Sequence, residues 1–521
     1  MNRRIKRALI SVSNKSNLSD LVETFQKYNI EIISSGGTAA VLRELGLSVV
    51  PIEEITGNPE AFGGRMKTLS FQVSSALLFR RGNEDDEQQA EYLGIQPIDL
   101  VLCNLYPFKR VLQQGGQLEE LIENIDIGGP TMLRAGAKNF DAVCTIVDPD
   151  DYVELIRILE ENDGSTTLKF RTDMALKVFS HTAQYDSLIA KTLEQKIVGY
   201  SQHIFVDTDS GKELRYGENP HQKAWMFSDE NDGGLACAQP LQGKTLSYNN
   251  MLDADAAYRS CVDMNVVLPN WHAVSLIKHL NPCGAAIAQT QMEAIKKAWA
   301  GDPVSAFGSI ICFNQRVEED TALFFKGKFV ELIIAPDFSE EALNFFVKKK
   351  NLRLLRLEMK DLSKYMVVRS INGGFLLQQE DSGLDPDVKL VTTKNVENID
   401  IDLLHFGTMI SKHIKSNAIV LVTKTESVFH LIGAGMGNPN RLVSTQQALS
   451  KAQENGYTDL SKAVLISDAF FPFRDNIDIA HQSGITTIVQ PGGSMRDQEV
   501  IDACNEYGIA MFFTGRRHFR H

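Results

Sequence analysis

The stretch Glu31–Leu45 reads EIISSGGTAAVLREL and passes from a short apolar run through a glycine-rich turn into a helical pattern. Glu31–Ser34 has the apolar content of a buried strand, and Ala39–Leu45 has apolar side chains at helical spacing. In the intervening turn, Ser35–Thr38, glycines let the backbone approach an anion, and the following helix directs N–H groups toward it. A strand, a turn and a helix in this order predict an α/β unit with a parallel sheet.

The same alternation continues on both sides of this stretch. Further strands are expected at Arg7–Ser13, Ile98–Cys103 and Ala142–Val147, and a helix at Leu18–Tyr28. Asp150–Lys196 is mostly helical in pattern, and a new unit begins near residue 200. Apolar runs that predict its strands lie at Ala273–Ile277, Ser309–Phe313, Leu332–Ala335, Ala418–Thr423, Ala463–Ile466 and Thr486–Val489. Helical patterns between these runs predict a second α/β unit, long enough for two subdomains.

Length and composition exclude several classes of protein. A chain of 521 residues is too long for one core and suggests about three domains. The net charge of −13 argues against nucleic-acid binding by general electrostatics. No apolar run is long enough to span a bilayer. The seven cysteines are scattered without a CxxC pair, which disfavours a disulfide framework or a zinc ribbon and favours a reducing cytosol.

Three segments of the first unit suit an anionic ligand. Taken alone, Ser35–Thr38 is better explained as a helix-capping turn than as an anion site, because short glycine-rich turns are weak signals. Ser11–Lys15 follows the first strand and adds donors and a cation, and ligands collect at the carboxyl ends of parallel strands. Arg65–Thr68 follows a diglycine and adds two cations, although a solvated basic loop has the same composition.

Candidate acids and bases follow later strands. Tyr106 is either a proton donor or part of a packed aromatic corner, and Asp126 with Lys138 is either a proton-transfer pair or a turn followed by a salt-bridged helix. Lys278 would lower the pKa of His279 by like-charge repulsion and leave it a base near neutral pH, whereas a structural histidine is the alternative. Cys283 has no second ligand at metal-binding spacing.

Twelve ordered segments give the chain a resemblance that runs from Ala8 to His521. They read SVSNK, SSGGT, GRMKTL, NLYPF, IDIGGPTMLRAGAKNF, LRYGENPHQ, LSYNNMLDADAA, KHLNPCG, DPVSAFG, SDAFFPF, PGGSMRD and FTGRRHFRH. The chain resembles the family of bifunctional purine biosynthesis proteins, in which AICAR transformylase is joined to IMP cyclohydrolase. The number and order of the matches make the resemblance specific.

The resemblance implies a fold and two activities. Residues 1–198 would form a methylglyoxal-synthase-like IMP cyclohydrolase domain. Residues 199–521 would form an AICAR transformylase domain of two cytidine-deaminase-like subdomains, split near 365–400. The enzyme would transfer a formyl group from its cosubstrate 10-formyltetrahydrofolate to AICAR, and then cyclise formyl-AICAR to IMP with loss of water. It would need no metal, bind neither nucleic acid nor membranes, and act in the cytoplasm as a homodimer with shared transformylase sites.

The resemblance also assigns roles to individual residues. For formyl transfer, His279 would remove a proton, Lys278 would stabilise the oxyanion, and Asn417 would hold the formyl oxygen or the substrate carboxamide. Ring closure would use Lys67, Tyr106, Asp126 and Lys138. The substrate-binding residues implied for ring closure are Ser13, Lys15, Ser35, Gly37, Thr38, Arg65, Thr68, Asn104 and Gly128. Those implied for formyl transfer are Arg215, Tyr216, Phe307, Gly308, Phe471, Pro472, Arg517 and His521.

Two segments depart from the family pattern. The family reads KTLHPxxHGG where this chain has KTLSFQVSSA, so the segment Ser70–Ala76 lacks both histidines. The loop Gly433–Ser444 is also divergent, with Val443 in place of an acidic residue. The first departure motivates an alternative, a transformylase whose N-terminal domain has lost cyclohydrolase activity. A non-catalytic nucleotide-binding protein is a third hypothesis, and the intact Lys278-His279 pair argues against it.

Overall fold

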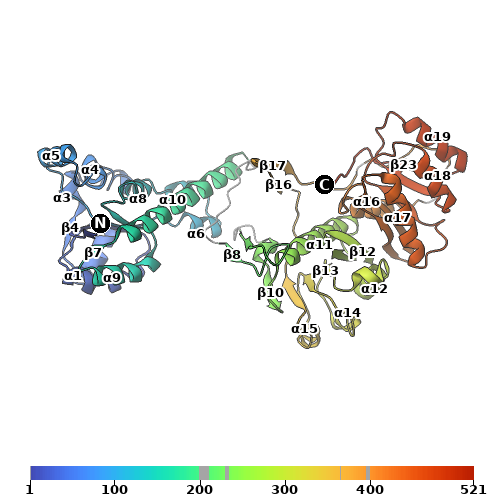
Figure 1. Ribbon diagram of the computed structural model, residues 1–521, viewed down its shortest axis with the longest axis horizontal. Coiled ribbons are helices and arrows are strands. Elements are labelled where there is room, and N and C mark those ends of the chain that lie inside the picture. Colours follow the sequence, from blue (N-terminus) through green and yellow to red (C-terminus); the bar gives the residue numbers. More distant parts are fainter. Residues whose placement is uncertain (1, 199–210, 229–233, 364, 386, 395–398) are drawn as a thin grey trace. The chain divides into compact units, whose positions relative to one another are not determined.

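The computed structural model describes residues 2–198, 211–228, 234–363, 365–385, 387–394 and 399–521. The chain forms two compact units, Met1–Asp209 and Ser210–His521, and many of their elements are labelled in Figure 1. We refer to them as unit 1 and unit 2. The predicted domain boundary between 198 and 199 adjoins residues 199–210, which lie outside the described residues.

Unit 1 is built on a five-stranded, wholly parallel sheet in the order β4-β3-β2-β5-β6. Its strands are β2 (Arg7–Val12), β3 (Glu31–Ser34), β4 (Val49–Pro51), β5 (Leu100–Asn104) and β6 (Cys144–Ile146). Neighbouring residues of a strand point to opposite faces, so Leu9 joins one apolar core and Ile10 the other. Both faces are therefore buried, and the continuous apolar runs of the sequence follow from this.

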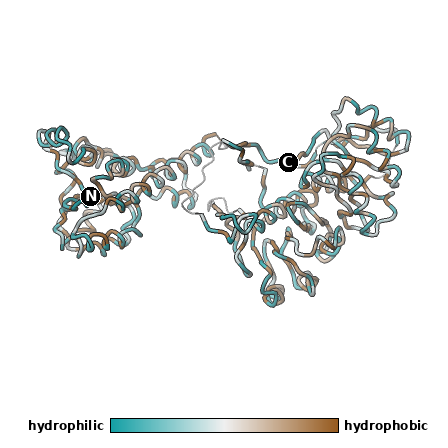
Figure 2. Tube along the Cα trace, in the orientation of Figure 1, coloured by the Kyte–Doolittle hydropathy of each residue, from teal (hydrophilic) through white to brown (hydrophobic). Residues whose placement is uncertain are grey.

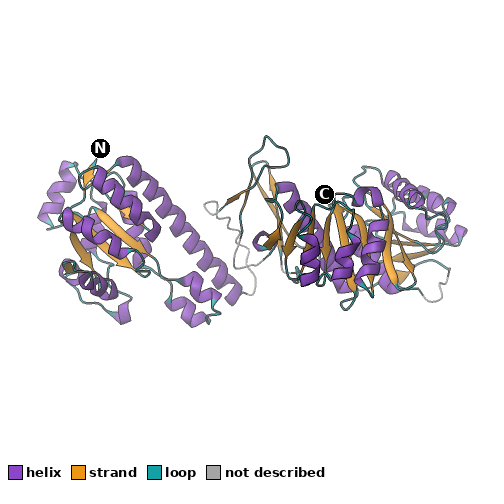
Figure 3. Ribbon diagram, turned by 90° about the horizontal axis from the view of Figure 1, so that it is seen from below, coloured by secondary structure: helices purple, strands orange, loops and turns teal. Residues whose placement is uncertain are grey.

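The helices of unit 1 cover these two faces, as the purple ribbons of Figure 3 show. They are α1 (Val22–Lys27), α2 (Gly36–Glu44), α3 (Ile52–Thr56), α4 (Phe71–Leu78), α5 (Glu84–Tyr92), α6 (Phe108–Gln113), α7 (Leu118–Glu123), α8 (Gly128–Lys138), α9 (Tyr152–Glu161) and α10 (Leu168–Ile197). Figure 2 shows hydrophilic and hydrophobic residues alternating along α10, as expected of a helix with one buried side. A short antiparallel pair, β1 (Arg3–Arg4) with β7 (Ser165–Thr166), completes the unit.

The predicted strands of unit 1 are confirmed as β2, β3, β5 and β6. The expected loop at Ser35–Thr38 is wrong in one respect, because α2 begins at Gly36 and only Ser35 stays extended. The expected helix Leu18–Tyr28 forms as a 3₁₀ turn, Leu18–Leu21, followed by α1.

Unit 2 is built on a twelve-stranded mixed sheet in the order β10-β15-β14-β13-β11-β12-β20-β19-β21-β22-β23-β18. Its strands are β10 (Gln239–Gln242), β11 (His272–Lys278), β12 (Asn281–Ala288), β13 (Ile310–Phe313), β14 (Leu332–Ala335), β15 (Arg353–Arg356), β18 (Lys389–Leu390), β19 (Ile419–Thr425), β20 (Val428–Gly435), β21 (Val464–Ser467), β22 (Thr487–Gln490) and β23 (Ala510–Phe513). All six apolar runs predicted for this region are strands of the sheet.

The two halves of this sheet repeat one topology. In each half an antiparallel hairpin, β11–β12 or β19–β20, is followed by a strand antiparallel to its first member and then by two strands parallel to that one. The halves meet where β12 pairs with β20. The expectation of two α/β subdomains agrees with this repeat, while the split near 365–400 stays a prediction.

The helices of unit 2 are α11 (Tyr248–Val267), α12 (Gln291–Ala300), α13 (Pro303–Ala306), α14 (Glu319–Phe324), α15 (Glu340–Phe346), α16 (Ile401–Lys412), α17 (Arg441–Glu454), α18 (Asp475–Gln482) and α19 (Asp497–Tyr507). Two hairpins stand apart from the sheet, β8 (Lys212–Glu213) with β9 (Trp225–Met226), and β16 (Met366–Ile371) with β17 (Gly374–Gln379). Within the described ranges, no helix combines the length and apolar content needed to cross a membrane.

Candidate active sites

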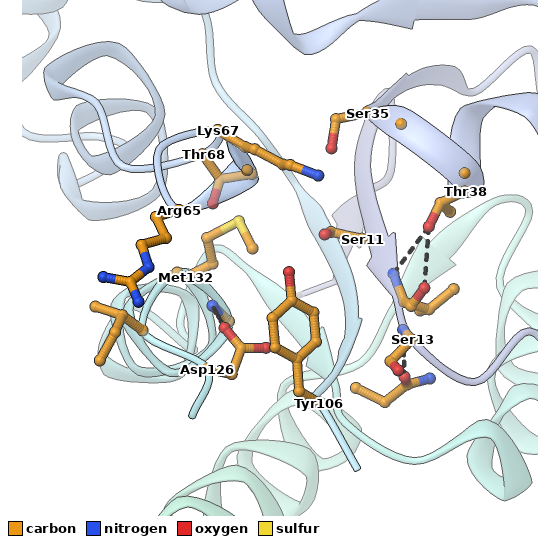
Figure 4. A pocket seen from close by; sticks show the side chains of 18 of the residues that line it. Ser11, Ser13, Ser35, Thr38, Arg65, Lys67, Thr68, Tyr106, Asp126 and Met132 are labelled. Carbon is orange, nitrogen blue, oxygen red and sulfur yellow. Dashed lines mark hydrogen bonds between the residues drawn. The ribbon is translucent and has the colours of Figure 1, made fainter. Parts of the chain in front are cut away.

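A cavity of about 630 Å³ opens at the carboxyl ends of the parallel strands of unit 1. Its walls come from the segments that follow β2, β3 and β5, which is where ligands bind in sheets of this type. Figure 4 shows Lys67, Tyr106 and Asp126 around this cavity, each from a different segment. Twelve of the sequence-predicted residues line it: Ser13, Lys15, Ser35, Gly37, Thr38, Arg65, Lys67, Thr68, Asn104, Tyr106, Asp126 and Gly128.

The first turn of α2 forms one side of the cavity. Ser35 caps the helix in an extended conformation, and Gly36 follows at φ 51°, a value that favours glycine. The Lys67 ammonium lies 3.7 Å from the position that a Cβ of Gly36 would occupy, and it pairs with Glu60 at 3.0 Å. Helix N–H groups and a lysine thus face one point, an arrangement suited to a phosphate group.

Two side chains hold the neighbouring loop in place. The Thr38 hydroxyl donates to the carbonyl of Val12 at 3.0 Å, which fastens α2 to the end of β2. The Asn104 amide oxygen accepts from the backbone N–H groups of Ser13 and Asn14 at 2.7 and 2.8 Å. Asn104 therefore shapes the wall of the cavity through the backbone of this loop.

Asp126 sits in a half-enclosed position at the start of α8. Burial raises the pKa of its carboxyl group, although the backbone N–H groups of Gly129 and Tyr106 donate to it and oppose that shift. The Tyr185 hydroxyl accepts from the Asp126 N–H at 2.8 Å and donates to the Asn124 carbonyl at 3.0 Å. Tyr185 lies on α10, and no sequence motif points to it.

Two parts of unit 1 that the sequence analysis singled out, Lys138 and the segment Ser70–Ala76, do not line this cavity. Lys138 ends α8 and is exposed; because a helix rises about 1.5 Å per residue, it lies about 15 Å along the axis from Gly128. Its catalytic role stays a prediction. The divergent segment Ser70–Ala76 also contributes no lining residue. In this stretch of the chain Leu69 is the last residue that lines the cavity, and the residues after it form α4, which is capped by the Ser70 hydroxyl.

The second candidate site lies at the tip of the β11–β12 hairpin. Lys278 is the last residue of β11 and pairs with Asn281, so His279 and Leu280 form a two-residue turn. Both turn residues have positive φ, 51° and 66°, as a primed hairpin turn requires. The turn explains how Lys278 and His279 line one cavity of about 300 Å³ although they are neighbours in sequence.

A set of hydrogen bonds fixes this turn. Asp253 accepts from the Leu280 N–H at 2.7 Å, and the Asn281 amide donates to the His279 carbonyl at 2.9 Å. Lys278 donates to the carbonyl of Phe307 at 2.7 Å. Asn281 also accepts from the Lys415 N–H at 3.1 Å, which joins the hairpin of the first half to the second half of the sheet.

Asn417 is held by the divergent loop Gly433–Ser444. Its amide oxygen accepts from Arg441 at 2.7 Å, and its amide nitrogen donates to the carbonyls of Asn438 and Pro439 at 2.8 and 3.0 Å. Arg441 is nearly fully buried and also pairs with Asp468. The sequence singles out Asn417 but gives no signal for Arg441 as its partner.

Cys283 lines the second cavity, but burial raises the pKa of its thiol to about 12. It is therefore a neutral thiol near pH 7 and a poor nucleophile. In the described part of the chain, no three His, Cys, Asp or Glu side chains are grouped as metal ligands would be.

Known proteins match both units. A profile described as the AICARFT/IMPCHase bienzyme matches residues 136–451, and an MGS-like domain profile matches residues 17–131. The chain is 45% identical to the bifunctional purine biosynthesis protein PurH of Aquifex aeolicus and 44% identical to that of Persephonella marina. Each alignment covers 99% of this chain and 100% of the relative. This chain belongs to the AICARFT/IMPCHase bienzyme family.

A solved structure also matches part of the chain. It is described as the crystal structure of ForH, and the match covers 37% of this chain and 98% of that one at 32% identity and a TM-score of 0.33. Family membership confirms the resemblance inferred from the twelve segments, the methylglyoxal-synthase-like fold of the N-terminal domain, and the prediction of a two-activity enzyme.

The remaining residues expected from the bienzyme family lie in unit 2, and Phe307 among them contacts the second site, because its carbonyl accepts from Lys278. Phe471 is fully buried in the core and lines neither of the two cavities described above, while Pro472 beside it is partly exposed. Gly308 donates its N–H to the Phe329 carbonyl at 2.9 Å. Arg215 stacks on Tyr216 at 5.4 Å, and Arg517 and His521 are exposed near the C-terminus. Neither cavity includes any of these residues.

Proposed function

We propose that the two units catalyse consecutive reactions of purine biosynthesis. Unit 2 transfers the formyl group of 10-formyltetrahydrofolate to the amine of AICAR, and unit 1 closes the resulting formyl-AICAR to IMP with loss of water. Membership of a family of bienzymes supports this assignment for the whole chain. The observation that supports assigning formyl transfer to Lys278 and His279 is the hairpin turn, which places both residues in the wall of one cavity.

In formyl transfer, the amine nitrogen attacks the formyl carbon, and the bond from that carbon to the folate nitrogen breaks. His279 takes the proton that the amine loses, because it lines the cavity from a turn of defined conformation. Lys278 stabilises the negative charge that develops on the formyl oxygen. Its ammonium donates one N–H to the Phe307 carbonyl, and its other N–H groups are available to the substrate.

In ring closure, the carboxamide nitrogen of formyl-AICAR attacks the formyl carbon of the same molecule, and the oxygen leaves as water. The N-terminus of α2 and Lys67 hold the phosphate, which fixes the position of the base. Tyr106 and Asp126 face the cavity, where they exchange protons with the reacting groups. Because the reaction is intramolecular, orientation supplies much of the acceleration.

The alternative, a transformylase with an inactive N-terminal domain, rested on the divergent segment Ser70–Ala76, and the position of that segment does not support it. The divergent Ser70–Ala76 segment begins α4 and contributes no side chain to the wall of the cavity, which keeps the expected residues. Removal of the two histidines therefore changes α4 and leaves the anion-binding turn intact.

A coupled assay of the full chain with AICAR and 10-formyltetrahydrofolate tests the proposal, with formyl-AICAR and IMP separated. We expect IMP as the product. His279→Ala should abolish consumption of AICAR, and Lys67→Ala should cause formyl-AICAR to accumulate. Accumulation of formyl-AICAR by the wild type would favour the alternative, and no turnover of either substrate would contradict both.

We also propose that the enzyme works in the cytoplasm as a homodimer without a metal. Five of the seven thiols are buried, in keeping with a reducing compartment. The β16–β17 hairpin exposes apolar side chains, among them Phe375 at 75%, a pattern typical of surfaces that associate. Sedimentation of the purified chain distinguishes a dimer from a monomer.

A further inference from the structure

Two side chains of α17 hold the segment 301–308, which forms part of the wall of the second cavity. Lys451 and Asn455 are four residues apart and therefore lie on one face of the helix. The Lys451 ammonium pairs with the Asp302 carboxylate at 3.3 Å. The Asn455 amide donates to the carbonyl of Gly301. Two consecutive residues of the segment are thus fastened to α17.

Asp302 transmits this contact to α13. Its carboxylate accepts from the Ser305 N–H at 3.1 Å and from the Ser305 hydroxyl at 2.7 Å, so it caps the helix. Burial raises the pKa of Asp302, but the hydrogen bonds from Ser305 and the charge of Lys451 outweigh burial and lower it. The carboxylate is therefore ionised near pH 7. A single turn of helix has little stability of its own, so the position of α13 depends on this cap.

The other end of α13 leads to Lys278. Phe307 follows the helix, and its carbonyl accepts from the Lys278 ammonium at 2.7 Å. The N–H of the same peptide unit belongs to Gly308 and donates to the Phe329 carbonyl at 2.9 Å. Because a lysine side chain is long and flexible, an acceptor held in this way fixes the direction of its ammonium group.

The two halves of the sheet come close together where this series of contacts begins. A Cβ on Gly301 would lie 2.9 Å from the carbonyl of Leu431 on β20, closer than side chains come in practice. The cavity that Lys278 lines is also lined by Gly301, Asp302, Leu431 and Lys451. The position of the Lys278 ammonium therefore depends on a strand and a helix of the other half of the sheet.

We propose that Asp302 and Lys451 are positioning residues for formyl transfer. Their ion pair sets the Phe307 carbonyl, which directs the Lys278 ammonium toward the formyl oxygen. This inference rests on the proposed formyl transfer by unit 2. The ammonium is needed most when negative charge develops, so the pair affects the chemical step more than the binding of either substrate. Lys451 also pairs with Glu454 at 3.4 Å, but that ion pair lies within α17.

The test compares two single variants and their double variant in the full chain. In Lys451→Met and in Asp302→Asn, kcat for AICAR formylation should fall about tenfold, and the KM for AICAR and for the cosubstrate should change less than about twofold. Asp302→Asn keeps an acceptor for the Ser305 N–H, so its effect reports the ion pair. The double variant should lose no more than either single variant, because both changes break one interaction. Lys451→Arg keeps the charge and should retain most of the activity.

Glu454→Gln is the matched control, because it removes the other partner of Lys451 and should leave kcat unchanged. Cyclisation of formyl-AICAR by unit 1 should be unchanged in every variant. A raised KM with an unchanged kcat would show that Lys451 contacts the substrate directly. Losses that multiply in the double variant would show that the two residues act separately. Either result would overturn the proposal.

Amide hydrogen exchange separates this inference from a failure of formyl transfer, because it needs no turnover. Exchange within residues 301–308 should be faster in Lys451→Met than in the wild type, and unchanged in Glu454→Gln. Equal exchange in Lys451→Met and the wild type would overturn the inference even if AICAR is formylated. A wild type that forms no formyl-AICAR would overturn the proposed function of unit 2, and faster exchange in Lys451→Met would then still support the structural role of the pair.

Discussion

The carboxylate of Asp253 accepts a hydrogen bond from the backbone N–H of Leu280 at 2.7 Å. Asp253 lies on α11, whereas Leu280 lies in the turn that carries His279. Two consecutive residues with positive φ cost about 1 kcal/mol or more each outside glycine, so the turn keeps its shape only while its surroundings hold it. Asp253 is therefore a positioning residue for His279.

Loss of this contact should reduce formyl transfer selectively. In Asp253→Ala we expect kcat for AICAR formylation to fall about tenfold to a hundredfold, since small displacements of a catalytic group have effects of this size. The KM for AICAR should change little, and cyclisation of formyl-AICAR by unit 1 should be unaffected. Asp253→Asn keeps an acceptor oxygen and should retain most of the activity. A parallel loss of both activities would indicate a folding defect instead.

Tyr185 should be required for cyclisation through Asp126. Its hydroxyl is the link between the Asp126 N–H and the Asn124 carbonyl, so Tyr185→Phe leaves both without a partner. We expect a loss of about 1–3 kcal/mol in the free energy of unfolding of unit 1 and a lower kcat for IMP formation. Formyl transfer serves as the internal control. Tyr152→Phe is the matched variant, because Tyr152 is buried in the same unit away from the cavity, and an equal effect there would contradict the assignment.

The C-terminal segment should become less stably attached as the pH rises. Burial disfavours the charged form of His518, but hydrogen bonds to Asp381 and Asp385 outweigh it and raise its pKa to about 9. Because the pKa of His518 is higher in the folded chain than in the unfolded chain, its protonation stabilises the fold. This contribution is complete below the unfolded pKa of about 6.5 and is lost as the pH rises through the folded pKa of about 9. It amounts to on the order of 3 kcal/mol.

Melting temperatures of the wild type and of His518→Gln, measured between pH 6 and pH 10, check this expectation. The difference between the two proteins should be largest at the acid end and should shrink toward pH 10. A difference that is constant with pH would show that the imidazole acts through packing alone.

Residues near one another in sequence were predictable, and those joined across the fold were not. The walls of the first cavity lie directly after apolar strands, so the order of elements indicates that the polar loops after β2 and β3 lie at one edge of the sheet, while the roles of the residues after β5 rest on the family resemblance. Tyr185 contacts Asp126 from 59 positions away, and Asp253 contacts Leu280 from 27, so no local motif joins either pair.

Closeness in sequence does not show which residues share a cavity. Lys138 follows Asp126 closely in sequence, but it ends α8 and does not line the cavity of this structure, so its role in ring closure stays a prediction. Phe471 belongs to an aromatic run that suits a flat ligand, and the tertiary structure places it in the core between β21 and α18. In both cases the fold decides which face of the segment is available, and the sequence pattern alone does not.

Arg441 should contribute to stability through one buried charge pair. Asp468 is almost fully buried, accepts from the Ser416 hydroxyl at 2.6 Å and is paired with Arg441, which also holds Asn417. Arg441→Met leaves the carboxylate without its counter-charge and should lower the free energy of unfolding of unit 2 by about 3–5 kcal/mol. Asp468→Asn in the same chain removes the charge and should recover part of that loss. Denaturant unfolding of the two single variants and the double variant measures the coupling, and strictly additive losses would show that the pair contributes nothing as a pair.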